Sequence, residues 1–215
     1  MEHDDEQDWI EIEAGIRAPW PELDDYLHLR PGHLIGIGAV RGSREAEAGY
    51  DLALHTAAQG RRTLLCAPDL SPRSPVPNLD IHRQVPHPEA LAALLDAATP
   101  HPFELVVVDH FGVIQTAADE GPIHHPEQAA DIVRDLKRLA MRRPAPTTLV
   151  VMAHLAAGTD NGMDPLKISA LGLAAELEYD ADTLLLLKRT GPHNVDILVA
   201  KDRYSPSPRK GSVCW

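Results

Sequence analysis

The 215-residue sequence predicts one α/β domain whose mostly parallel sheet is flanked by helices. Short runs of Leu, Ile and Val without regular polar alternation indicate strands that are buried on both faces. Segments with apolar residues at helical spacing separate these runs. The last two runs follow one another across "RTGPHN" without a helix, so we expect an antiparallel hairpin at the end of the sheet.

The predicted elements follow in a regular order. Each expected strand is a short apolar run, and these runs cover residues 34–39, 62–67, 104–109, 147–153, 182–188 and 195–201. The first helix is expected over residues 44–59, with Ser43 as its N-cap and acidic residues in its first turn. Further helices are expected around residues 91–95 and 132–139. Linker-like stretches lie at residues 68–78, 115–128 and 156–169.

The net charge of −12 is concentrated at the N-terminus. Residues 1–25 hold ten acidic residues and one arginine, a net charge of −9, which leaves −3 for residues 26–215. We divide the chain into an acidic leading tail, residues 1–14, and one domain, residues 15–215. Because Trp9, Ile10 and Ile12 interrupt the acidic tail, it is interpreted either as a solvated tail or as a docking segment.

Composition favours a cytoplasmic protein without a membrane partner. No apolar run approaches the ~18 residues of a membrane span, and the acidic N-terminus does not resemble a secretory signal. Cys66 and Cys214 have neither metal-ligand spacing nor a disulfide framework. Both are predicted to be buried thiols.

The stretch "LIGIGAVRGSREAEAGYDLALHTAAQ", residues 34–59, indicates a strand, a glycine-bearing turn and a helix. In a phosphate-binding loop of this order, backbone N–H groups and a lysine bind the anion, while a hydroxyl holds Mg²⁺. The candidate cofactor-binding residues are Gly42, Ser43, Arg44, Glu45 and Ala46. Aligned without gaps, Arg44, Glu45 and Ala46 occupy the glycine, lysine and hydroxyl positions. A loop one residue shorter places Ser43, Arg44 and Glu45 there, and either register lacks the magnesium hydroxyl.

Five stretches together carry a family resemblance. They are "GIRAPWPELDDYLHLRPGHLIGI", "LVVVDHFGVIQ", "HPEQAADIVRDLKRLAMRRPAPTTLVVMAHL", "SALGLAAELEYDADTLLLLKR" and "VDILVAKDRYSPSP". In this order they resemble the RecA-fold motor domain of the DnaB-type replicative helicases, including its Walker B strand and its last two motifs. The resemblance covers residues 15–215 and implies a RecA-like P-loop NTPase fold. A RadA-like or KaiC-like relative of the same fold is the alternative.

The resemblance implies ATP and Mg²⁺ as cofactors, but the loop departs from the family's Gly-Lys-Ser/Thr. One unit-charge contact at ~4 Å is worth about 4 kcal/mol at an effective dielectric constant near ~20. Exchanging lysine for Glu45 therefore removes several kcal/mol, and each ~1.4 kcal/mol is tenfold in affinity. We expect no cofactor, with ATP and Mg²⁺ bound only if this degenerate loop functions in an unusual form.

Other positions match the resemblance in part. Asp109 stands at the family's magnesium-organising aspartate, and Asp69 at its catalytic glutamate. His154 replaces a glutamine that senses the γ-phosphate. These three are candidate catalytic residues, vestigial or weak, and Asp109 is a metal ligand only if nucleotide binds. Strand-end aspartates that cap loops and a satisfied core-edge histidine are the alternatives.

Lys201 and Arg203 preserve a Lys-x-Arg spacing that in this family reaches into the neighbouring subunit's nucleotide site as an arginine finger. Their alternation places both on one face of the last predicted strand. A solvated, charged strand edge is the alternative explanation.

Two loops that the resemblance places along a DNA channel are acidic. Residues 115–132 contain four acidic residues and no Lys or Arg, and residues 156–169 contain two acidic residues against Lys167. Neither loop has an aromatic residue, whereas gripping a nucleic-acid strand requires cations or stacking aromatics. Nucleic acid is therefore a disfavoured partner.

Two function classes follow. The first is a non-catalytic RecA-fold module that binds itself, a DnaB-type ring or another protein. The alternative is an ATP-dependent NTPase, similar to a DNA helicase or recombinase, with an unusual phosphate loop.

Overall fold

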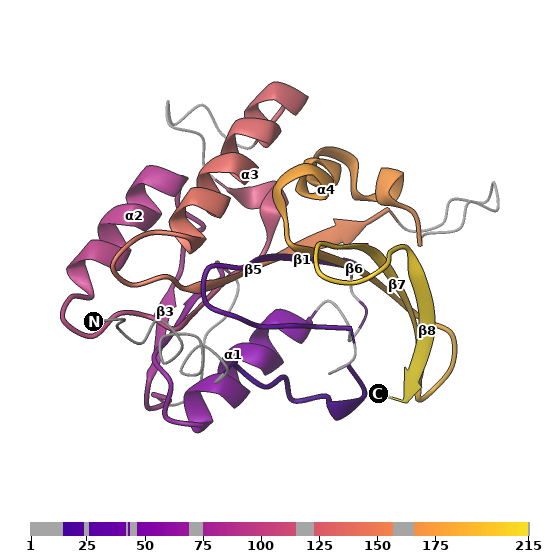
Figure 1. Ribbon diagram of the computed structural model, residues 1–215, viewed down its shortest axis with the longest axis horizontal. Coiled ribbons are helices and arrows are strands. Elements are labelled where there is room, and N and C mark those ends of the chain that lie inside the picture. Colours follow the sequence, from indigo (N-terminus) through magenta and orange to yellow (C-terminus); the bar gives the residue numbers. More distant parts are fainter. Residues whose placement is uncertain are drawn as a thin grey trace, which may run out of the picture.

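The computed structural model describes residues 15–23, 26–41, 43, 47–68, 75–114, 123–156 and 166–214. Within these ranges one eight-stranded sheet has the order β3-β2-β4-β5-β1-β6-β7-β8 (Figure 1). The strands are β1 (Leu34–Val40), β2 (Thr63–Cys66), β3 (Leu79–His82), β4 (Leu105–Val108), β5 (Thr148–Leu155), β6 (Thr183–Arg189), β7 (Asn194–Asp202) and β8 (Arg209–Cys214). The α-helices are α1 (Ala48–Ala58), α2 (Pro88–Ala97), α3 (Pro126–Ala140) and α4 (Leu177–Asp180), and the 3-10 helices are η2 (Pro21–Leu23), η4 (Phe111–Val113) and η5 (Ile168–Glu176).

The strand pairing confirms the predicted fold class. Strands β3, β2, β4, β5, β1 and β6 pair in parallel, whereas β6, β7 and β8 form an antiparallel end. All six expected strands are present, with ends shifted by one or two residues. The sequence prediction missed β3 and β8, which lie at the two edges of the sheet. Both are short and expose polar side chains, so neither gives the apolar run of a buried strand.

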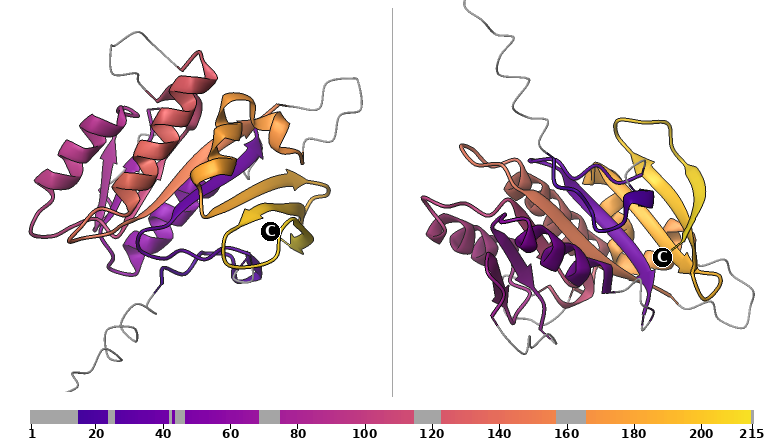
Figure 2. Two further views of the ribbon diagram at one scale, coloured as in Figure 1. Left: turned by 45° about the horizontal axis from the view of Figure 1, so that its top comes forward. Right: turned by 90° about the horizontal axis from the view of Figure 1, so that it is seen from below.

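Helices cover both faces of the sheet, which explains the uninterrupted apolar runs. α2, α3, α4 and η5 pack on one face with strand residues such as Val106 and Leu149. α1 and the N-terminal segment pack on the other face with Ile35 and Val107. Figure 2 shows the N-terminal segment passing beside β8, where the guanidinium of Arg209 lies 5.7 Å from the ring centroid of Tyr26.

Several predicted boundaries are corrected by the structure. α1 begins at Ala48, not at residue 44, and Glu47 is its N-cap, with no side-chain capping hydrogen bond. Ser43 therefore does not cap α1; its N–H donates to the carbonyl of Val40 at 3.0 Å, in a turn that directly follows β1. α3 begins at Pro126, inside the predicted linker 115–128, because proline suits a first helical turn. Likewise, η5 begins at Ile168, within the predicted linker 156–169.

The two cysteines differ. Cys66 in β2 is buried as predicted, and burial raises the pKa of its thiol to about 12. Cys214 at the end of β8 is exposed, so the prediction of a second buried thiol was wrong. β8 is an edge strand whose residues alternate in exposure, and Val213 rather than Cys214 faces the core.

Gly49 lets α1 approach the sheet closely at the helix N-terminus. A Cβ at this position would lie 2.7 Å from Cγ of Met152 and 3.0 Å from Cγ1 of Val107. Both neighbours are fully buried, so they have little room to move. This contact fixes the first turn of α1 over the carboxyl ends of β4 and β5.

We predict that Gly49→Ala destabilises the protein by about 1 kcal/mol. Overpacking a core costs about 1–3 kcal/mol, which exceeds the gain of up to about 1 kcal/mol in helix propensity. Urea denaturation measures the change. In a Met152→Ala background the added methyl enters vacated space, so the same substitution becomes neutral or stabilising. An equal loss in both backgrounds would contradict the packing explanation.

Candidate functional site

The carboxyl ends of β1, β4 and β5 meet at one edge of the sheet and bring two of the predicted site residues together. His154 lies in β5 opposite Ala39 of β1, and Asp109 directly follows β4, where its N–H donates to the carbonyl of Cys66 at 2.9 Å. Ser43 lies in the turn that follows β1. Ligands of open α/β sheets bind at such carboxyl edges. The other predicted residues here, Asp69, Gly42, Arg44, Glu45 and Ala46, lie outside the described residues.

His110 is a residue of this edge that the sequence interpretation missed. Its ring centroid lies 3.9 Å from that of His154, with an angle of 43° between the planes. Nδ1 of His110 accepts a hydrogen bond from the N–H of Gly112 at 3.2 Å, so a neutral ring carries its proton on Nε2. His110 therefore presents a donor rather than a metal-ligating lone pair. Its position next to Asp109 in "VVVDHF" was the available signal.

Arg41 places a positive charge beside His154. Burial is the main cause that lowers the pKa of His154 below 6.5, and the charge of Arg41 lowers it further. Histidine with a lowered pKa is neutral at pH 7. Within the described ranges, no group of three or more His, Cys, Asp or Glu side chains could hold a metal ion. This part of the edge thus offers imidazole donors, one carboxylate and one arginine.

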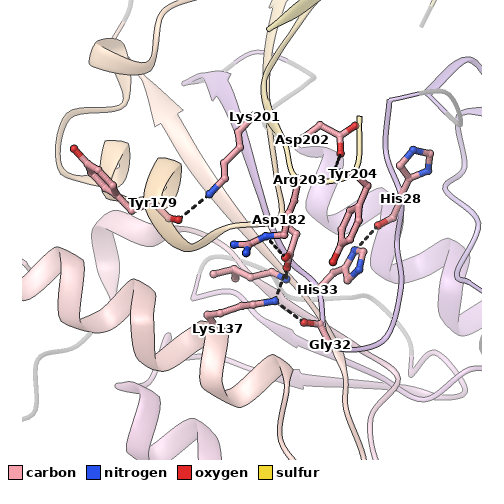
Figure 3. A network of polar contacts seen from close by, with 11 residues as sticks. His28, Gly32, His33, Lys137, Tyr179, Asp182, Lys201, Asp202, Arg203 and Tyr204 are labelled. Carbon is pink, nitrogen blue, oxygen red and sulfur yellow. Dashed lines mark hydrogen bonds and ion pairs between the residues drawn. The ribbon is translucent and has the colours of Figure 1, made fainter. Parts of the chain in front are cut away.

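The opposite, amino edge of the sheet contains a buried carboxylate, Asp182. Its side chain is 1% exposed, and its Oδ2 accepts from the N–H of Leu34 at 2.8 Å and from Nζ of Lys137 at 2.6 Å (Figure 3). Nε of Arg203 lies 3.0 Å from the other oxygen, Oδ1. Lys137 also donates to the carbonyl of Gly32 at 2.9 Å. This network joins α3, β1, β6 and the end of β7, and the sequence interpretation did not identify it.

Lys201 and Arg203 lie at this amino edge. Lys201 belongs to β7 and its Nζ donates to the carbonyl of Tyr179 in α4 at 2.7 Å (Figure 3). Burial, followed by the charge of Arg203, lowers the pKa of Lys201. Arg203 lies one residue beyond the end of β7, and its N–H donates to the carbonyl of Asp182 at 2.8 Å. Both cations are therefore held by their own chain.

A pair of stacked rings continues the network beyond Arg203. The rings of His33 and Tyr204 are stacked, with centroids 4.9 Å apart and planes 6° from parallel. Nδ1 of His33 donates to the carbonyl of His28 at 3.3 Å. Burial lowers the pKa of His33, although the nearby carboxylate of Asp182 acts in the opposite direction. Polar contacts thus form a row from His28 to Tyr179 across the amino edge (Figure 3).

Comparison with known proteins identifies the fold. No protein-family model and no curated protein match the chain. Among solved structures, the ATPase domain of a DnaB-like replicative helicase is similar at a TM-score of 0.76 and 16% identity, covering 97% of this chain and 92% of that one. A second DnaB-like replicative helicase, whose structure describes its interactions with primase, is similar at a TM-score of 0.75 and 16% identity, covering 100% of this chain. The chain has the DnaB-type ATPase fold.

The resemblance inferred from the sequence is thus confirmed for the fold. The chain spans 66% of the length of the second helicase, just under two thirds. In the DnaB-type fold of this chain, the two clusters of candidate residues lie at opposite ends of the parallel strands. Among the helices of the described segments, none is both long and apolar enough to cross a bilayer.

We predict that Asp182→Ala destabilises the protein by about 3–5 kcal/mol. Removing one partner of a buried ion pair leaves the others uncompensated, here Lys137 and the N–H of Leu34. Urea denaturation with and without the substitution measures the loss. Glu178→Ala, at an exposed position in α4, is the matched control and should change stability by less than about 0.5 kcal/mol. Equal effects of the two substitutions would show that the network contributes nothing specific.

Proposed function

We propose that the chain is a non-catalytic module of the DnaB-type fold that binds a second copy of itself, a DnaB-type ring or another protein. The observation that carries the proposal is the placement of its charged residues on opposite edges of one sheet. Lys201 and Arg203 lie at the amino edge, whereas Asp109 follows the carboxyl end of β4. A seven-residue strand such as β1 separates the edges by roughly 20 Å.

The carboxyl edge does not fit a magnesium nucleotide. Asp109 is the kind of hard oxygen ligand that Mg²⁺ prefers. However, Glu45 stands at the lysine position of the phosphate loop and Ala46 at its hydroxyl position, so the loop would repel phosphate and supply no oxygen to the metal. His110 and His154, packed ring against ring, add neutral donors but no positive charge. We therefore assign no step of hydrolysis to this edge.

The amino edge supports association. Nε of Arg203 is bound to Asp182, and its two terminal nitrogens have no bonding partner within the described part of the chain. A guanidinium held in this way can bind a carboxylate through its remaining N–H groups. Because the two edges of one chain cannot meet, the carboxylates of Glu45, Asp69 and Asp109 would be offered to Arg203 only by a neighbouring subunit. Carboxylates would then replace the phosphates of a nucleotide as its partner.

A nucleotide-dependent NTPase with an unusual loop is the second candidate. Arg41 favours it, because this cation lies beside His154 at the edge where an anion would bind. Asp109 is also retained at the strand end. The nucleotide experiment below separates the two candidates.

We predict little or no ATP hydrolysis by the purified protein. Calorimetric titration of ATP with Mg²⁺ present, together with a phosphate-release assay, tests this expectation. Turnover that disappears in Asp109→Asn would overturn the proposal, since only a working magnesium site responds to that change.

The reverse substitution tests the physical reason. Arg44→Gly/Glu45→Lys/Ala46→Thr restores the family's loop and should raise nucleotide affinity at least about tenfold, equivalent to recovering ~1.4 kcal/mol of charge attraction. Glu89→Gln, at an exposed position of α2, makes the same net charge change away from the loop and should leave affinity unchanged. If the loop variant gains nothing, the loop sequence is not what prevents nucleotide binding.

We predict that association depends on Lys201 and Arg203 and weakens with salt. Exposed charge pairs are screened beyond ~8 Å at physiological ionic strength. Light scattering at low and high salt compares wild type with Lys201→Ala/Arg203→Ala, alone and with a DnaB-type ring. Lys210→Ala, at an exposed position in β8, is the control. A monomer under every condition, or an assembly indifferent to both residues, would reduce them to a solvated edge.

A further inference from the structure

A groove lies where the described chain begins, and it is lined by cations. Ile16 pairs with Leu29, and its N–H donates to the carbonyl of Leu29 at 2.9 Å. This bridge borders a cavity of about 270 Å³ whose lining includes Gly15, Arg17 and Arg30. The acidic tail, residues 1–14, is therefore joined to the domain directly at this groove.

The groove is continuous with the surface that presents Arg203. His28 lines the groove, and its carbonyl accepts the hydrogen bond from His33, whose ring stacks on Tyr204. Tyr204 is the residue after Arg203. Figure 3 shows His28, His33, Tyr204 and Arg203 following one another across this edge. A chain that leaves the groove along this row reaches Arg203 first and Lys201 beyond it.

The cations of this surface lack acidic partners. Arg17 and Arg30 are exposed, and their side chains form no hydrogen bond or ion pair within the segments that the structure describes. Elsewhere on the surface, by contrast, Arg134 and Arg138 of α3 each pair with an aspartate three residues earlier. Arg203 is 48% exposed at its side chain and is bound only through Nε. An anionic segment fits this surface better than a neutral one.

The tail has the complementary chemistry. It holds seven acidic residues and no Lys or Arg, and Trp9, Ile10 and Ile12 lie among them. Tyr204 and Tyr179, which flank the two cations, are 57% and 72% exposed and offer apolar area to these side chains. Because the tail is tethered at Gly15, its effective concentration at the groove is of millimolar order. Fourteen residues can span up to ~45 Å, enough to follow the whole row.

We propose that the acidic tail docks in cis on this surface, with its carboxylates at Arg17, Arg30 and Arg203. Docking occupies the terminal nitrogens of Arg203 that a neighbouring subunit would otherwise use. The tail is thus a built-in competitor of association through the amino edge. The competition rests on the proposed function, whereas the docking itself does not.

Protection of the tail from a glutamate-specific protease tests the docking in the full chain. The readout is the initial rate of cleavage after Glu11 and Glu13 at low salt. Arg17→Glu/Arg30→Glu should speed cleavage by about fivefold, as expected for the loss of two exposed ion pairs. Arg83→Glu/Arg143→Glu reverses two exposed arginines away from the groove and should leave the rate unchanged.

A charge swap distinguishes docking from a general effect of charge. Asp4→Lys/Asp5→Lys/Asp8→Lys should restore protection in the Arg17→Glu/Arg30→Glu background, because it re-forms the pairs with opposite signs. Protection should not depend on protein concentration if the tail docks in cis. Cleavage that is indifferent to the groove arginines, or protection that appears only as concentration rises, overturns the proposal; the latter result would assign the tail to a second copy.

The competition has its own readout. Neutralising the tail by Asp4→Asn/Asp5→Asn/Asp8→Asn should lower the concentration at which light scattering detects association. If association depends on Lys201 and Arg203 but ignores the neutralised tail, competition is overturned. If no association occurs with either tail, the proposed function fails, while the protease rates still decide whether the tail docks.

Discussion

The carboxylate of Asp182 is the interaction on which the arrangement of this protein depends. Removing a carboxylate from water is costly unless good partners satisfy its oxygens. Here a backbone N–H from β1, an ammonium from α3 and a guanidinium beyond β7 supply that compensation. The backbone joins in, since the N–H of Asp182 donates to the carbonyl of Leu34 at 2.7 Å. One buried anion therefore fixes the register of β6 on β1 and the position of α3 over that junction.

The same anion determines what the amino edge presents to solvent. Because Asp182 binds Nε of Arg203, the guanidinium is held with its terminal nitrogens available, and less rotamer entropy remains to be lost on binding. Lys201 is anchored separately on the end of α4. The carboxyl edge has a different character, because its packed histidines are neutral donors and its preserved carboxylate has no lysine beside it in the loop sequence. The two ends of the same strands thus favour different chemistry.

Much of the fold was predictable because strands buried on both faces leave an apolar run that needs no tertiary information. Asp109 and His154 were found because strand ends in a parallel sheet share an edge. Asp182 was not found, since a lone aspartate in "YDADTLL" gives no local sign that it meets Lys137, 45 residues away. His110 was overlooked beside the more familiar aspartate. β3 and β8 escaped because edge strands obey weaker patterning than central ones, and α1 began late because the turn at Ser43 precedes it.

The margins of the sheet have a consequence for the shape of any assembly. An open strand edge is a template for adding further strands, and stacking of that kind grows without limit. This sheet ends on one side in β8, which carries Arg209 and Lys210, and on the other in β3, where Asp80 pairs with Arg62 of the neighbouring loop. Fixed charges on both margins disfavour backbone pairing between molecules. Contacts between copies are then left to side chains at the strand ends, a geometry compatible with closed, finite complexes rather than fibres.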